Sequence, residues 1–201
     1  MNSNGVNVIF RDLLLGLIGI LVMAFFVVLL QVSAQKKTSE GQIPPGSITV
    51  LITWPSGDID VDLWVMGPGE PYPVGYSSKS GRLFNLLRDD LGTKPDFTDV
   101  NMESAFSRGS PAGEYIINLH CYRCPIVPQV VKVEVGLNKD LMSGRGAAVL
   151  ATATVTLFQN GQERTAVRFK LDDKADVVPD SMTSVFTPLR SAGMNKESPG
   201  G

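Results

Sequence analysis

The feature that most constrains this chain is an uninterrupted apolar run from Leu13 to Leu30. At a rise of 1.5 Å per residue, these eighteen residues make a helix of about 27 Å, close to the hydrocarbon thickness of a bilayer. A core helix of a globular domain has a polar face, and this run has none. The sequence therefore predicts an N-terminal segment over 1–12, one transmembrane helix over 13–33, and the rest of the chain on one side of a membrane.

Removal of this segment after export is the alternative to its retention. Val32-Ser33-Ala34 fits a small-x-small cleavage signal. Against removal, Arg11 is the only basic residue before the apolar run, and the run is longer than the apolar region of a usual signal peptide. We favour retention as an anchor.

Asp12 stands at the start of the apolar run, and two interpretations of it stay open. If the helix starts at Leu13, the Asp12 carboxylate caps it by accepting the free N–H groups of the first turn. If the helix starts nearer Val6, Asp12 lies about one turn inside the membrane, where an ionisable group marks a functional site by default. Gly16 and Gly19 share its helical stripe and are predicted helix-packing positions, because glycine lets another helix approach closely.

Over about residues 7–33, the short polar N-terminus, the Phe10-x-Asp12 pair and the single span resemble the B subunits of ion-driven membrane motors, the MotB, TolR and ExbD type. The resemblance implies that Asp12 carries a proton or a sodium ion. It also implies a homodimer inside a pentameric ring of multi-span A-type subunits in a bacterial inner membrane. The N-terminus would then be cytoplasmic, and the periplasmic domain would engage an unknown periplasmic or cell-wall partner. The chain departs from MotB in having no recognisable peptidoglycan-binding domain, and Lys36 and Lys37 lean toward the opposite orientation by the positive-inside rule.

Beyond a polar linker over 34–46, the apolar residues recur with a period of two, which is typical of half-buried strands. Asn160-Gly161 adds a tight hairpin signal, and residues 88–112 read as a long irregular segment of the kind that is often functional. The predicted strands run over 47–54, 60–65, 83–87, 115–119, 131–135, 151–157 and 165–171. No helical period of useful length follows residue 35, so we expect an all-β, antiparallel β-sandwich over 47–172 and a partly disordered tail over 173–201.

The candidate metal ligands are five aspartates: Asp58, Asp60, Asp62, Asp89 and Asp90. The first three alternate on one predicted strand face, and the last two lie in the later polar segment. Calcium favours several carboxylates that converge from different loops, so a calcium site is one interpretation. The alternative is a solvated strand face, or aspartates that cap turns through backbone N–H groups.

The same region resembles a family of uncharacterised bacterial exported β-domains over about residues 48–135. The residues that carry this resemblance are Trp54, Asp60 to Val65, Pro68-Gly69, Arg88-Asp89-Asp90 and Pro111 to Tyr115. The resemblance implies a fold and an exported location but no activity. The chain departs from the family pattern over 94–99, where a glycine-rich segment is usual.

The two cysteines, Cys121 and Cys124, are three positions apart at the end of a predicted strand. In an oxidising compartment we favour a small structural disulfide, with free thiols or a metal or redox pair as the alternatives. Zinc would need a second ligand pair, and the chain has one histidine, His120.

Charge and motif content limit the classes of function. The formal net charge is −2 with scattered lysines and arginines, which does not favour a nucleic-acid surface. His120 has no obvious acid partner in the sequence, and neither a nucleophile elbow nor a phosphate loop occurs, so we do not expect an enzyme. Two functions remain: a B-type motor subunit, or a membrane-anchored β-sandwich that binds a ligand or protein without ion transport.

Overall fold

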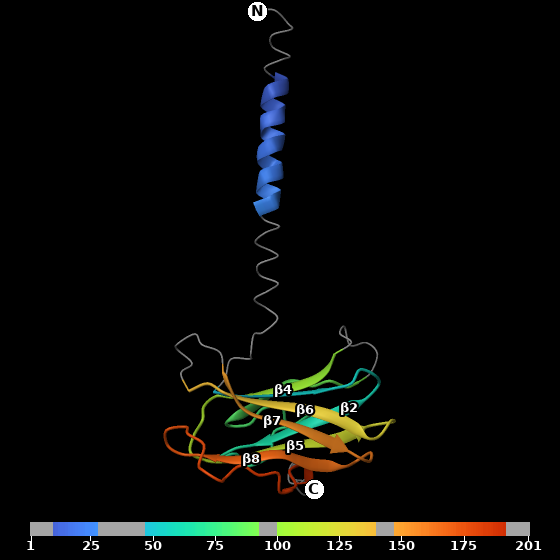
Figure 1. Cartoon of the computed structure of the whole chain (residues 1–201), viewed down its shortest axis with the longest axis vertical. Helices are drawn as coiled ribbons and strands as arrows, with labels where there is room; N and C mark the ends of the chain where they lie inside the picture. The colour runs from blue at the N-terminus through green and yellow to red at the C-terminus, as the bar shows by residue number, and fades with distance from the viewer. Residues whose placement is uncertain (1–9, 28–46, 93–99, 140–146, 192–201) are drawn as a thin grey trace, which may run out of the picture. The chain divides into compact units, whose positions relative to one another are not determined.

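The computed structural model describes residues 10–27, 47–92, 100–139 and 147–191 (Figure 1). The chain divides into two compact units, Met1–Gln42 and Ile43–Gly201. The predicted linker over 34–46, the cleavage motif, and the tail beyond 191 lie outside the described residues, as do 28–33 of the predicted span.

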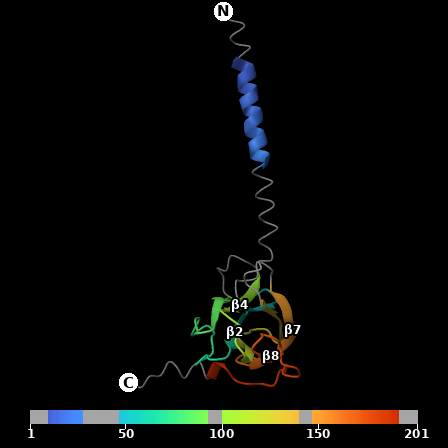
Figure 2. The same cartoon turned by 90° about the vertical axis from the view of Figure 1, so that its left-hand side faces the viewer.

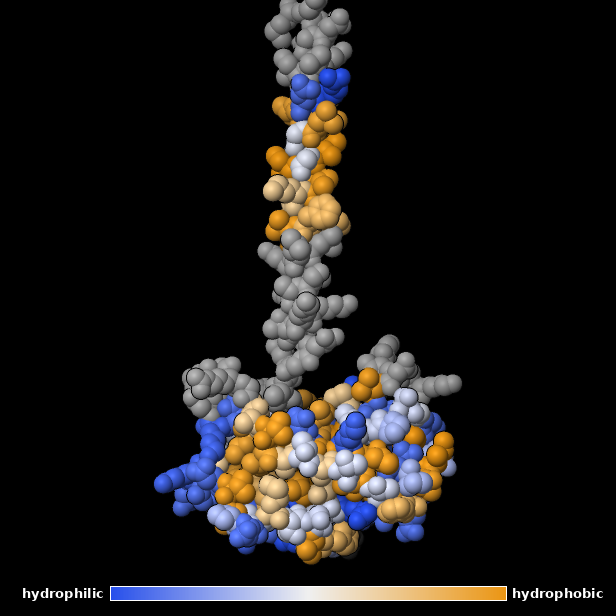
Figure 3. Space-filling view, viewed as in Figure 1, coloured by the Kyte–Doolittle hydropathy of each residue, from blue (hydrophilic) through white to orange (hydrophobic). Residues whose placement is uncertain are grey.

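The first unit holds a helix over Phe10–Val27 that is long and apolar enough to cross a membrane. Its apolar side chains are exposed, including Leu13, Ile20 and Phe25, and Figure 3 shows them along the visible face of the helix. Exposed apolar surface of this kind is unfavourable in water, so this N-terminal helix fits a membrane anchor or a signal sequence.

The described residues of the second unit form eight strands in two antiparallel sheets, which confirms the predicted β-sandwich. A five-stranded sheet has the order β3-β4-β1-β6-β7, and a three-stranded sheet has the order β2-β5-β8. The strands are β1 (Ile48–Trp54), β2 (Asp60–Met66), β3 (Phe84–Arg88), β4 (Asn101–Ser107), β5 (Gly113–Arg123), β6 (Gln129–Leu137), β7 (Ala148–Leu157) and β8 (Glu163–Leu171). Figure 1 and the turned view in Figure 2 show the two sheets as stacked layers.

The core fills the space between the sheets because most strands place their branched apolar residues on one face. In the register of β1 against β6, Val50 lies opposite Val135 and Ile52 opposite Val133, and all four side chains are buried. From the other sheet, apolar residues of β2, β5 and β8 pack against them, among them Leu63. Apolar residues at every second position of these strands therefore give each sheet the apolar face that packs against the other sheet.

One part of the sequence-based prediction is wrong: the segment 88–112 is not irregular throughout, because it contains β4. The inward positions of β4 carry polar or small residues, Asn101, Glu103, Ala105 and Ser107, which are all buried. Its apolar residues, by contrast, point to the partly exposed face. The alternation that predicts a half-buried strand is therefore reversed in β4: its polar or small residues face inward, and its large apolar residues face outward.

A second difference concerns the far side of the three-stranded sheet. A solvated face was one of the alternatives for the side of β2 that carries Asp60, Asp62 and Trp64, yet all three residues are buried. Leu189 packs against Trp64 and Ile116, and the Asn118 side chain donates to the Thr187 carbonyl at 2.7 Å. The chain beyond the expected domain boundary at 172 therefore covers this face.

The connection between β2 and β3 is organised by Glu70, which is buried. Its carboxylate accepts hydrogen bonds from the backbone N–H groups of residues 82–84 at 2.7 to 2.8 Å. Three donors on one carboxylate form a charge-assisted cluster, which holds this long connection against the edge of the sandwich.

Candidate metal site

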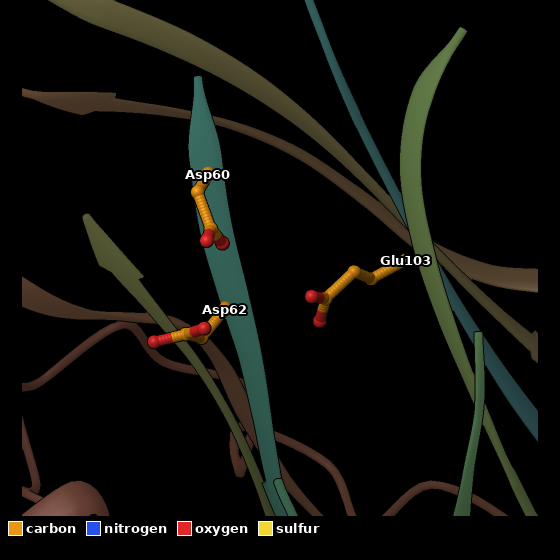
Figure 4. Close-up of side chains that lie close together, drawn as sticks. All are labelled: Asp60, Asp62 and Glu103. Atoms are coloured by element: carbon orange, nitrogen blue, oxygen red, sulfur yellow. The ribbon is translucent and has the colours of Figure 1, made fainter. Parts of the chain in front are cut away.

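Three buried carboxylates meet where β2 of one sheet lies beside β4 of the other. Asp60 and Asp62 come from β2 and Glu103 from β4, and one oxygen of each lies within 4.8 Å of the others. Their relative exposures are 3%, 4% and 1%, respectively. Figure 4 shows the Glu103 side chain extending from β4 toward β2, where Asp60 and Asp62 lie. Acidic side chains are almost never buried to this extent unless they are paired or bind a cation.

Strand geometry explains how residues so distant in sequence come together. Asp60 and Asp62 alternate with core residues on β2, so their side chains lie on the face away from the core. Glu103 lies opposite Ile52 of β1 and therefore points inward with it. Its side chain then reaches the edge of β2, where Oε2 accepts the Leu63 N–H at 2.7 Å.

Glu103 thus connects the two sheets through its hydrogen bonds. Besides the Leu63 N–H, it accepts the Asp90 backbone N–H on Oε1 at 3.3 Å. The Asp89 side chain also hydrogen-bonds with Glu103. A carboxylate has about four lone-pair sites, so Glu103 can still ligate a cation.

Asp62 is held by a histidine. Its Oδ2 lies 2.8 Å from Nδ1 of His120 on β5, and both side chains are buried. This is the acid partner of His120 that sequence inspection did not find. The contact fixes the Asp62 carboxylate and leaves its other oxygen, Oδ1, for the cluster.

Asp60 carries a buried carboxylate oxygen that has no partner in the described part of the chain. Its Oδ1 atom is buried and has no hydrogen-bond partner among the described residues. An unpartnered buried carboxylate oxygen carries a large desolvation cost that a bound cation or a proton would remove.

Burial raises the pKa of all three acids, and the charge of Asp62 adds to the rise for Asp60 and Glu103. Burial, then the charge of Asp62, raises the pKa of Asp60 to about 7, against a partial lowering by Arg123. Burial also raises the pKa of Asp62, opposed by its hydrogen bond with His120. Burial raises the pKa of Glu103 well above its ordinary value, opposed by the hydrogen bond from Leu63. At neutral pH the group therefore needs positive charge, either as protons or as a metal ion.

The donor set fits a hard divalent cation, and the buried Asp60, Asp62 and Glu103 group could hold one. Calcium and magnesium take carboxylate and carbonyl oxygens, with water completing the shell. The available protein ligands are both oxygens of Asp60, Oδ1 of Asp62, and the remaining lone pairs of Glu103.

Of the five aspartates named as candidate calcium ligands, the structure brings two into this cluster. Asp58 precedes β2, is exposed, and pairs with Arg123 at 3.0 Å. Asp89 pairs with Lys79 at 2.7 Å and lies near enough to raise the pKa of Asp60 and Glu103, but it is outside the cluster.

Asp90 lies outside the cluster and stabilises the loop after β3. Its carboxylate pairs with Arg88 at 3.2 Å and accepts the backbone N–H groups of Gly92 and Met102. The turn-capping alternative therefore describes Asp90 better than metal ligation does.

The other candidate site residues lie as follows. Asp12 is the third described residue of the N-terminal helix, with a carboxylate oxygen 3.8 Å from Nε of Arg11. A side chain added at Gly16 or Gly19 would meet nothing within 4 Å, so this stripe is open for another helix in the described structure. The ion-carrying and helix-packing roles stay predictions.

The two cysteines are buried at the end of β5. Cys121 and Cys124 form a disulfide, and the described chain contains no free cysteine. Cross-links of this kind persist in oxidising compartments.

No protein-family model, curated protein or solved structure matches the chain. Of the two resemblances considered from the sequence, the structure shows the general layout alone: an N-terminal apolar helix followed by two antiparallel β-sheets.

Proposed function

We propose that this protein is a membrane-anchored β-sandwich binding module that holds a calcium ion between β2 and β4 and faces the periplasm. The observation that carries the proposal is the buried, unpartnered Oδ1 of Asp60 inside a group of three carboxylates. The apolar N-terminal helix supports the anchor, and the disulfide supports an oxidising compartment.

Calcium suits this site better than magnesium. Magnesium demands near-ideal octahedral geometry and keeps several waters, whereas calcium accepts six to eight oxygens in irregular arrangements. The three carboxylates come from two different sheets, and hydrogen bonds to His120 and Leu63 already fix the positions of Asp62 and Glu103. Calcium sites in extracellular modules bind with dissociation constants of roughly 10⁻⁴ to 10⁻³ M, and we expect this range here.

Bound calcium would stabilise the contact between the two sheets. It would neutralise the repulsion among Asp60, Asp62 and Glu103, and it would leave the Glu103 hydrogen bond to the edge of β2 in place. The module could then present a defined surface to a partner outside the inner membrane.

Calcium binding by the full chain in detergent micelles tests this proposal directly. After removal of metal with a chelator, we expect calorimetric titration with CaCl₂ to show one site, and MgCl₂ to bind at least tenfold more weakly. Asp60→Asn and Glu103→Gln are expected to abolish the calcium signal. Asp58→Asn is the matched control, because it removes an exposed acid two residues from Asp60 and should bind calcium like the wild type.

The calcium proposal fails under two results. One is the absence of binding at millimolar calcium by folded wild-type protein. The other is equal binding by the Asp60→Asn variant and the wild type.

A second candidate, the B-type subunit of an ion-driven motor, is favoured by the position of Asp12. The described helix begins at Phe10, so Asp12 lies within the helix rather than before it, which is not the place of an N-cap. In this function two copies would sit inside a pentameric ring of multi-span A-type subunits, and Asp12 would take up and release H⁺ or Na⁺. A unit charge that crosses 100 mV releases about 2.3 kcal/mol to drive the motion.

Copurification from detergent-solubilised membranes separates the two candidates. The motor predicts that a multi-span protein purifies with the chain, and that Asp12→Asn keeps this complex but stops motor-dependent activity. The binding module predicts that a neutral helix of equal length replaces the native one without loss of function. Unchanged motor activity in Asp12→Asn would remove Asp12 as the ion carrier.

A further inference from the structure

Among the described residues, three of the four sheet edges of the sandwich are covered by other segments, and the edge of β7 is not. The edge of β8 is bridged by residues 177–183, and that of β3 by residues 79–81. The edge of β2 pairs with Val74 and with the Glu103 carboxylate. Natural sheets cover their edges in this way because unpaired backbone groups readily recruit another strand.

β7 lacks this protection. In the described structure its outer backbone meets one group, the Arg164 guanidinium, which donates to the Thr156 carbonyl at 3.0 Å. The strand runs for ten residues, Ala148–Leu157, without a charged residue, proline or glycine. A register shift near Leu150 interrupts its start, and the remainder, 151–157, pairs regularly with β6. Charges, prolines and short length usually blunt an edge strand, and β7 has none of these.

The residue order of β7 is suited to pairing with itself. Since the Thr156 carbonyl faces outward, the backbone groups of Thr152 and Thr154 face outward too, because orientation alternates along a strand. Antiparallel pairing centred on Thr154 places that residue opposite itself and Thr152 opposite Thr156 of the other copy. Threonine pairs across strands are favourable, and no side chain of 148–157 carries a charge that would oppose the pairing. The Arg164 guanidinium has to release the Thr156 carbonyl, so that the Thr152 N–H of the other copy can take its place.

We propose that β7 pairs antiparallel with β7 of a second copy of this chain, joining two five-stranded sheets into one continuous sheet. A second copy is the expected occupant because pairing about Thr154 makes the edge self-complementary. A membrane anchor would confine the copies to one plane and so raise their effective concentration. The pairing is independent of the calcium site, which lies between β2 and β4.

Disulfide trapping on the full chain tests this pairing. The native cysteines are bonded to each other, so Thr154→Cys introduces the one free thiol. Strand pairing places opposite Cα atoms about 5.5 Å apart, within disulfide range. We expect mild oxidation in membranes to convert most of the protein to a covalent dimer. Val130→Cys is the matched control: it is exposed on β6, one strand in from the edge, and should stay monomeric.

A second substitution tests whether the cross-link depends on the edge itself. Adding Thr152→Lys to the Thr154→Cys chain places like charges in the paired edge, and it should reduce cross-linking at least tenfold. Tryptophan fluorescence checks that the domain is still folded, since both tryptophans, Trp54 and Trp64, belong to it. Cross-linking no greater than that of Val130→Cys, or cross-linking that persists with Thr152→Lys, would overturn the proposal.

Discussion

Replacing Asp60 with asparagine should make the β-domain more stable at alkaline pH in the absence of metal, although the substitution removes a charged group. Burial and the neighbouring Asp62 raise the pKa of Asp60 from the usual 3.8 to about 7. The folded state therefore binds more protons than the unfolded state between about pH 4 and pH 7. The free energy of unfolding falls as pH rises through this window and levels off above it.

The size of the effect follows from the same difference in pKa. Each pKa unit corresponds to 1.36 kcal/mol, so the ionised Asp60 costs the fold at most about 4 kcal/mol at pH 8. Screening by water that reaches the site lowers this to roughly 2 kcal/mol. Asparagine has no such charge, so the variant should gain roughly 2 kcal/mol at pH 8 and nothing at pH 4.

Urea unfolding of the full chain in detergent, followed by tryptophan fluorescence, measures this effect. Titrations in chelator at several pH values from 4 to 8 should show a steep decline for the wild type and a shallower one for Asp60→Asn. The slope does not vanish in the variant, because burial also raises the pKa of Asp62 and Glu103. With calcium at 100 times its dissociation constant, the wild type should regain about 2.7 kcal/mol and the variant almost none.

Asp58→Asn serves as the control here as well, because this exposed acid should leave the pH dependence unchanged. Wild-type stability that is flat between pH 5 and pH 8 would refute the reasoning. The same holds for an Asp60→Asn variant that is less stable than the wild type at pH 8 in chelator.

Three further substitutions test other parts of the fold by the same urea assay. Glu70→Gln should lower the free energy of unfolding by about 2 kcal/mol, because a charged acceptor of three backbone N–H groups is lost. Gly92→Ala should cost about 2 to 3 kcal/mol, since φ is +59° and the new Cβ would collide with the Ile59 carbonyl. Replacing Cys121 and Cys124 together with serine should cost about 2 kcal/mol, the value expected for a short closed loop. Effects below 0.5 kcal/mol would contradict the structural role given to each residue.

Much of the sandwich could be predicted from the sequence because its inward positions are branched and apolar. β1 and β6 illustrate this, since Ile52 and Val133 lie opposite each other in the core and alternate with polar neighbours. β4 could not be found in this way, because Glu103 and Ala105 occupy its inward positions while Phe106 is partly exposed. Its strand conformation comes from pairing with β1 and β3, which is a tertiary effect that local periodicity does not carry.

Two of the three residues of the candidate site could be found from the sequence, because local strand periodicity shows Asp60 and Asp62 but not Glu103. Asp60 and Asp62 attract attention because they alternate on a strand, but nothing local separates them from Asp58 or Asp90. The difference lies in position: Asp58 faces solvent beside Arg123, and Asp90 caps backbone N–H groups. Glu103 joins the site through the packing of one sheet against the other.

The double attachment of Glu103 has a consequence for motion. The carboxylate that accepts the Leu63 N–H also belongs to the group that could hold a metal ion, so the edge of β2 is held by a carboxylate whose charge depends on pH. Local opening between β2 and β4 at Glu103 would expose the backbone amides of Leu63 and Asp90, while the rest of the core stays closed. Hydrogen–deuterium exchange at these two amides would therefore report the ionic surroundings of the protein well before the domain unfolds.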